Sequence, residues 1–348
     1  NQQKMMQSMI KTTFISMALT AAVSMKAQNP VQYMEKISAE FKKISEETWD
    51  YTRAVAHNKK ARQIEGQRKQ MLNANRNGLN KIKNMQGFNG STAYRDSTVK
   101  YLDLSYAVLN NDYSKIVDME EISEQSYDAM EAYMMAQQVA NDKLEAAFDI
   151  AVAANEKFAA ENNIRLIEEK SKTGEKMEKA SEVFKFYNKI YLVFFKPYKQ
   201  EMYLIDAQSK GDINAMKQNQ ESLSKLAKEA KEKLKTIEAY RNNTTLKAAC
   251  TEVMDFYIME ADTKVPALID FYLKKEKFDK LKTATDKKGK NLSQSEVNEF
   301  NAAVNDYNKA SADYNKINAY LNAKRSSVLE GWNNAVSRFL DKNVSKKK

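Results

Sequence analysis

Residues 34–55 decide how this chain folds, and they read MEKISAEFKKISEETWDYTRAV. Side chains suited to a buried helix face recur in this stretch at alternating steps of three and four: Met34, Ile37, Phe41, Ile44, Thr48, Tyr51 and Val55. This spacing gives a helix one apolar seam that packs against other helices. We therefore expect a helix over about 31–57, begun by the capping residue Asn29 and by Pro30 in the first turn.

The same seam returns 143 residues later, at Met177, Ala180, Phe184, Tyr187, Tyr191, Phe194 and Tyr198. Further along, residues 233–240 follow the pattern of 81–88 at an offset of 152. We interpret the chain as an internal duplication. The predicted fold is all-α, with two tandem antiparallel four-helix-bundle repeats of long helices at 29–170 and 171–345, followed by a basic tail at 346–348.

Few helix-breaking residues occur, so the helices should be long. The 348 residues contain only 8 Gly and 3 Pro, against average usage of about 7% and 5%. One uninterrupted helix is predicted over about 119–163, and Pro197 should kink or end the helix that contains it. Other expected boundaries are 110–112, Gly211 with the cap Asp212, the polar loop 286–290, and the capping-box pair Ser293 and Glu296.

The first 28 residues have the pattern of a signal peptide. Lys11 precedes an apolar run over 14–23, which is shorter than the ~20 residues needed to span a bilayer. Cleavage is expected after Ala27 or Gln28. The alternative is an ordinary amphipathic first helix. We expect export because the run is uniformly apolar rather than periodic, and no later segment is apolar enough to cross a membrane.

The residue types needed for most catalytic and metal sites are missing from the sequence. His57 is the only histidine and Cys250 the only cysteine, which excludes an intramolecular disulfide and any site with two imidazoles. The scattered glycines cannot form a phosphate-binding loop. The acidic residues of 118–131 could form an all-carboxylate cation site, but a solvated acidic face is the favoured interpretation. We therefore predict no catalytic residue, no metal and no cofactor.

Charge is segregated along the first half of the chain. Residues 53–100 contain eleven basic and two acidic side chains, whereas 101–170 contain five basic and fifteen acidic ones. The basic block includes a candidate patch for an anionic partner: Lys59, Lys60, Arg62, Arg68 and Lys69. The favoured alternative is that this basic helix pairs with the acidic segment 118–131. Nucleic acid is not expected, because 59–69 contains no aromatic side chain that could stack on bases.

Four aromatic residues form a candidate apolar pocket or interface. Trp49 lies one position off the first seam and should flank the core. Tyr191, Phe194 and Phe195 belong to a run, 190–195, that is apolar on every side. Such a helix must be covered all round. It either passes between the two repeats or leaves an apolar surface for another chain or an acyl ligand.

Three segments carry a resemblance to a family of exported or surface helical proteins of Gram-negative bacteria, whose activity is unknown. They are Trp49 to His57, Asp118-Met119-Glu120-Glu121, and Tyr191 to Lys196. The resemblance implies a location in the periplasm or on the outer surface. We expect a non-enzymatic envelope protein that interacts with an envelope protein, glycan or lipid. The alternative is a binding protein that holds an apolar or anionic ligand between the two repeats.

Overall fold

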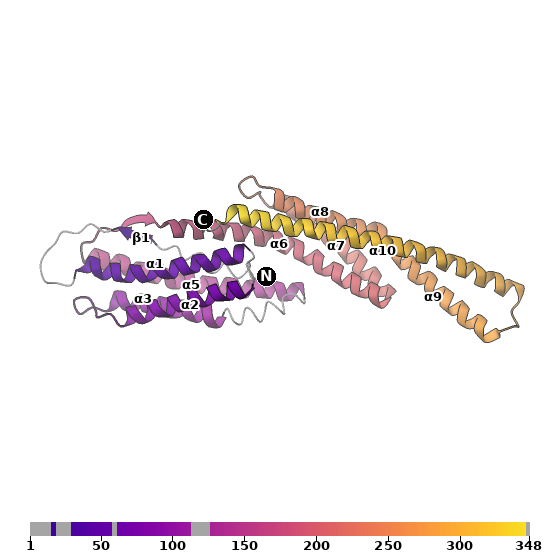
Figure 1. Cartoon of the computed structure of the whole chain (residues 1–348), viewed down its shortest axis with the longest axis horizontal. Helices are drawn as coiled ribbons and strands as arrows, with labels where there is room; N and C mark the ends of the chain where they lie inside the picture. The colour runs from indigo at the N-terminus through magenta and orange to yellow at the C-terminus, as the bar shows by residue number, and fades with distance from the viewer. Residues whose placement is uncertain (1–14, 19–28, 58–60, 113–125, 346–348) are drawn as a thin grey trace. The chain divides into compact units, whose positions relative to one another are not determined.

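The chain is helical in the computed structural model, which describes residues 15–18, 29–57, 61–112 and 126–345 (Figure 1). One pair of four-residue strands interrupts the helices in these ranges. The predicted all-α fold is therefore confirmed. Lys59, Lys60, most of the predicted signal peptide with its cleavage site, the motif at 118–121 and the basic tail lie outside the described residues.

The chain divides into two compact units. Unit 1 comprises residues 1–188 and 337–348, and unit 2 comprises residues 189–336. This division does not coincide with the repeat boundary predicted at 170/171. Repeats are defined by sequence similarity and units by packing, so the boundary between repeats stays a prediction.

Unit 1 contains, in chain order, β1 (Ile15–Ala18), α1 (Pro30–Ala56), α2 (Ala61–Lys83), α3 (Ala93–Ala107), the π-helical turn η2 (Val108–Asp112), α5 (Tyr127–Glu161), β2 (Ile167–Lys170) and the first part of α6 (Lys172–Lys210). Helix α1 packs on α2, α2 on α3, and α3 on α5. The side chain of Asn29 accepts hydrogen bonds from the backbone of Val31 and Gln32, as the cap predicted for α1 requires. Strands β1 and β2 pair antiparallel.

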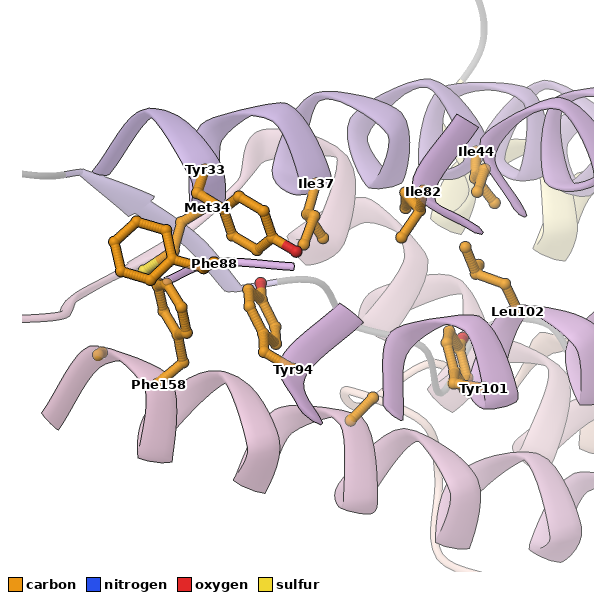
Figure 2. Packing of buried hydrophobic residues seen from close by; sticks show 12 residues of the cluster. Tyr33, Met34, Ile37, Ile44, Ile82, Phe88, Tyr94, Tyr101, Leu102 and Phe158 are labelled. Atoms are coloured by element: carbon orange, nitrogen blue, oxygen red, sulfur yellow. The ribbon is translucent and has the colours of Figure 1, made fainter. Parts of the chain in front are cut away.

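The core of unit 1 is built around the ring of Phe158 on α5. Its centroid lies 5.6 Å from that of Tyr33, 5.1 Å from that of Phe88 and 5.0 Å from that of Tyr94. Figure 2 shows these rings converging from α1, from the turn after α2, from α3 and from α5. Aromatic pairs at such separations contribute roughly 0.5–1.5 kcal/mol each beyond area burial. One side chain therefore connects four parts of the unit.

Both predicted seams face inward. Of the seven positions in α1, six are buried and Phe41 is half-buried. Of the seven in α6, five are buried, and Tyr191 and Tyr198 are half-buried. The three-and-four spacing therefore identified the packed face of each helix.

Unit 2 contains the rest of α6, then α7 (Ile213–Thr236), α8 (Thr245–Met259), the π-helical turn η3 (Glu260–Lys264), α9 (Val265–Lys288) and α10 (Gln294–Asn343) up to Val336. Two of its predicted boundaries are confirmed. Gly211 has a φ of +66° and Asp212 accepts a hydrogen bond from the backbone of Ala215. The capping box forms between the backbone N–H of Ser293 and Glu296 Oε2, at 2.9 Å, and between the backbone N–H of Glu296 and Ser293 Oγ, at 3.3 Å.

One backbone motif occurs twice, 152 residues apart. The helices of the first copy, α2, α3 and η2, recur as α7, α8 and η3 with the same starting offset. In both copies a backbone bridge closes the turn between the helices, Phe88 with Ser91 and Tyr240 with Asn243. The two residues inside each bridge have positive φ: Asn89 and Gly90, then Arg241 and Asn242. The backbone geometry therefore repeats at the same offset of 152 residues as the sequence pattern.

A basic side chain braces each of these turns from the same position. Arg95 Nη1 donates to the carbonyl oxygen of Met85 at 2.8 Å. Lys247, at the equivalent place in the second copy, donates through Nζ to the carbonyl oxygen of Ile237. These carbonyls lie just past the ends of α2 and α7, where backbone acceptors lack helical partners.

Five local expectations need correction. The helix expected over about 119–163 begins only at Tyr127, because Ser126 has an extended backbone and caps α5. The predicted break at 110–112 is a continued helix, because η2 extends the backbone as a π turn to Asp112. Of the two outcomes expected at Pro197, an end to the helix is wrong, since α6 continues to Lys210, and a kink stays a prediction. Helix α9 includes the first three residues of the expected loop and ends at Lys288, before Gly289 with its φ of +56°. The strand pair was not expected, because neither four-residue segment has a strand pattern distinct from its surroundings.

Replacing Phe158 with alanine should destabilise unit 1 by about 3–5 kcal/mol, the usual cost of emptying a buried aromatic site. Urea denaturation followed by circular dichroism would measure it. Ile150→Ala on the same helix is the matched control, since Ile150 is 64% exposed and should change stability by less than about 0.5 kcal/mol. Equal effects of the two substitutions would contradict the central role of Phe158.

Candidate functional site

A cavity of about 560 Å³ lies within unit 1, bounded by α1, α3, α5 and the start of α6. Helix α1 contributes Glu35, Ser38, Ala39, Phe41, Lys42, Ser45 and Glu46. The other lining residues are Tyr94 and Thr98 of α3, Phe148, Ala151, Val152 and Asn155 of α5, and Ser171, Lys172 and Thr173. Its volume is within the roughly 300–1,000 Å³ typical of small-molecule sites.

The apolar wall of the cavity is continuous with the core. Tyr94 lines the cavity and also lies 5.0 Å from the ring of Phe158. Phe41 and Phe148 both contact the ring of Tyr101, at centroid distances of 5.9 and 5.6 Å. These aromatic side chains are therefore held in place by the packing behind them, which gives the cavity a preformed apolar surface.

The polar groups of the cavity fall into two sets. Two of the hydroxyls are engaged within the protein: Ser45 Oγ donates to Met177 Sδ at 3.7 Å, and Thr98 Oγ1 donates to the Tyr94 carbonyl at 2.9 Å. The charged groups are exposed and make no ion pair within the described residues; they are Glu35, Lys42, Glu46 and Lys172. The charges are therefore available to a ligand, whereas these hydroxyls already have partners.

The start of α6 also borders the cavity. Ser171 Oγ accepts from the backbone N–H of Gly174 at 3.0 Å and so caps the helix. Lys172 and Thr173 occupy the first turn, whose N–H groups have no intrahelical acceptor. The helix macrodipole places partial positive charge at this end.

The predicted basic patch is partly neutralised where it is described. Arg68 donates to Glu65 through Nε at 2.8 Å and through Nη2 at 3.1 Å, and Lys69 Nζ lies 3.9 Å from the same carboxylate. The hydrogen bond from Arg68 is the main reason why the pKa of Glu65 is lowered. Arg62 is exposed. The carboxylate that pairs with Arg68 and Lys69 thus belongs to their own helix.

The four candidate aromatic residues do not line the cavity. Trp49 belongs to unit 1 and is 7% exposed, with the Lys176 ammonium 6.0 Å from its ring centroid. Tyr191, Phe194 and Phe195 belong to unit 2. Phe194 stacks on Trp332 at 4.5 Å with an interplanar angle of 11°. These side chains therefore fill packed regions, as core residues do.

Unit 2 contains a buried charge cluster that the sequence interpretation missed. Arg325 on α10 donates through Nε to Glu201 Oε1 on α6 and through Nη2 to Glu260 Oε1 in η3, each at 2.5 Å. Glu201 and Glu260 are 1% and 2% exposed. A signal was present in the sequence, because Glu201 continues the second seam three residues after Tyr198. Arg325 likewise lies between the apolar positions Leu321 and Val328.

Burial favours the protonated form of one carboxyl in this cluster. Burial, with the Glu201 carboxylate adding to it, raises the pKa of Glu260 to about 8, although Arg325 acts in the opposite direction. Glu260 Oε2 is buried and accepts from no donor, so the proton has a place on this oxygen. With one proton and one guanidinium the cluster is electrically neutral, as burial requires. It holds α6, η3 and α10 together and has no part in the cavity of unit 1.

Neither metal-binding nor membrane-spanning features emerge within the described ranges. No group of three or more His, Cys, Asp or Glu side chains there is arranged to hold a metal ion. Among the helices described, none combines the length and the apolar character that crossing a bilayer requires. Comparison with family models, with curated proteins and with solved structures yields no match.

The stability of unit 2 should fall as pH rises, because of Glu260. Its folded pKa lies above the usual carboxyl value of 4.5, so between about pH 5 and 8 the folded state binds a proton that the unfolded state has lost. Each pH unit in this window lowers stability by up to ~1.4 kcal/mol. Glu260→Gln should flatten this decline in urea melts at pH 6, 7, 8 and 9. The control Glu252→Gln, an exposed site on α8, should keep it, and a decline of equal slope in both variants would refute the assignment.

Proposed function

We propose that this protein is an exported, non-enzymatic binding protein of the cell envelope, and that its ligand occupies the cavity of unit 1. The observation that carries the proposal is the cavity itself. It combines a preformed apolar wall with exposed, unpaired charges, the usual composition of a small-molecule site. Of the envelope components considered from the sequence, a lipid-like molecule fits this arrangement better than a protein or a glycan.

The ligand site proposed from the structure differs from the one that the sequence suggested. The sequence suggested a position beside Tyr191, Phe194 and Phe195. The stacking of Phe194 on Trp332 favours a packing role for these side chains. The cavity of unit 1 is lined by a different set of residues, and we place the ligand there.

Binding rather than catalysis is supported by the chemistry of the lining residues. None of the residues that line the cavity is a histidine or a cysteine, so a nucleophile there would lack the usual imidazole base. The buried carboxyls Glu201 and Glu260 are matched by Arg325. Such a cluster is commonly structural, and we assign it that role.

Export and duplication form part of the same proposal. The apolar run at 14–23 and the resemblance to surface helical proteins of Gram-negative bacteria support a location in the periplasm or on the outer surface. The motif repeated at an offset of 152 residues supports descent from one duplicated helical bundle. Removal of residues 1–28 would take β1 away from β2.

Filling the cavity should weaken the binding of an apolar probe. Nile red, which fluoresces strongly in apolar surroundings, should bind the mature chain, and Val152→Trp should weaken that binding by about tenfold or more because Val152 lines the cavity. Ala153→Trp is the matched control, since Ala153 is exposed on the same helix. Fluorescence titration measures both. Equal binding by the two variants would place the probe elsewhere and remove the basis of the proposal.

Expression of the full chain in a Gram-negative host should release a mature protein that begins at Gln28 or Asn29. Cell fractionation and N-terminal sequencing would establish this. Replacing the apolar residues Leu19 and Val23 with aspartate should block processing, because a charged segment is no longer read as a signal h-region. Cytoplasmic, unprocessed protein from the unmodified chain would contradict export.

A further inference from the structure

The charges at the cavity mouth indicate the kind of head group that the ligand carries. Lys42 and Lys172 supply two cations, and Glu35 and Glu46 supply two carboxylates. All four are exposed and unpaired within the described residues. Elsewhere on α1 similar side chains are paired, as in the contact of Glu40 with Lys43 at 2.8 Å and with Lys81 at 3.2 Å. The mouth therefore presents both signs of charge in equal number.

A ligand that carried only an anion would meet the two lysines and also the two carboxylates. A ligand that carried only a cation would be attracted by the two carboxylates and repelled by the two lysines. A zwitterion can satisfy both, because each of its charges faces groups of opposite sign. The positive end of α6 at Lys172 and Thr173 adds a preference for the anionic part on that side.

The apolar wall of the cavity indicates the chemistry of the rest of the ligand. Phe41, Tyr94 and Phe148 line the cavity together with Ala151 and Val152, and these mostly apolar side chains suit an alkyl chain. A cavity of about 560 Å³ is near the middle of the range for ligand sites, roughly 300–1,000 Å³, and we assign it one alkyl chain.

The geometry points to a single-chain zwitterionic phosphate amphiphile as the ligand class. Its phosphate faces Lys42, Lys172 and the first turn of α6. Its cation faces Glu46, which lies one helical turn after Lys42 on α1, and its alkyl chain lies against the aromatic wall. This inference rests on the proposed binding function and adds the chemistry of the head and the tail.

Four detergents with the same dodecyl tail test the head group. Dodecylphosphocholine, dodecyl phosphate, dodecyltrimethylammonium and dodecyl maltoside would each displace Nile red from the mature chain, below the concentration at which they form micelles. Dodecylphosphocholine should bind about tenfold more tightly than each of the other three, a modest factor because exposed ion pairs are individually weak. Inorganic phosphate alone should displace no probe.

Matched variants test the residues. Lys42→Ala with Lys172→Ala should remove the advantage of dodecylphosphocholine over dodecyl maltoside, and so should Glu46→Ala. The control, Lys36→Ala with Lys185→Ala, should keep it, since both lysines are exposed and neither lines the cavity. Glu35→Ala is a second control that should keep the advantage, because Glu35 lies about two helical turns from Lys42. All six side chains are exposed, so these variants should fold normally.

The outcomes separate the two proposals. If dodecyl maltoside or dodecyl phosphate binds as tightly as dodecylphosphocholine, the zwitterion inference is overturned while binding in the cavity stands. If the charge variants behave like the control, the inference is overturned as well. If no dodecyl compound displaces the probe, and Val152→Trp has no effect, the proposed binding function fails with it.

Discussion

The ring of Phe158 lies within 5.6 Å of three other rings, which come from α1, from the turn after α2 and from α3. Because protein interiors are packed as densely as organic crystals, none of these rings can shift without moving the others. Tyr94 takes part in this stack and also lines the cavity. The position of the cavity wall is therefore a consequence of core packing, and a ligand would meet a surface already in place.

The second unit has a buried charge cluster in addition to its aromatic packing. Glu201 and Arg325 occupy places on otherwise apolar helix faces, and Glu260 lies in a π-helical turn. Removing one partner from such a cluster leaves an unpaired buried charge, which is strongly destabilising, whereas an apolar replacement of the whole cluster is often harmless. Its value to the protein is thus in fixing which faces of α6, η3 and α10 meet. The same interaction makes the stability of unit 2 sensitive to pH.

Sequence reasoning identified the helices well and the site poorly, for physical reasons. Asn29, Gly211 and the pair Ser293 and Glu296 act through bonds to backbone a few residues away, so their effect can be read locally. The basic patch and the aromatic residues were chosen by composition. Arg68 then proved to pair with Glu65 in its own helix, and Phe194 to stack on Trp332. The buried cluster could have been found, because a charged residue on an apolar seam is a visible anomaly.

The sequence by itself determined the helical class, the inward face of each seam, several helix ends and the 152-residue repeat, because all of these depend on spacing along one chain. Only the tertiary structure decided that Lys42 and Lys172, 130 residues apart, border one cavity, and that Arg325 reaches both Glu201 and Glu260. A cavity is the space that packing leaves unfilled, and a buried ion pair depends on two faces meeting. Both are properties of the arrangement of helices and leave no periodic signal in the residues that form them.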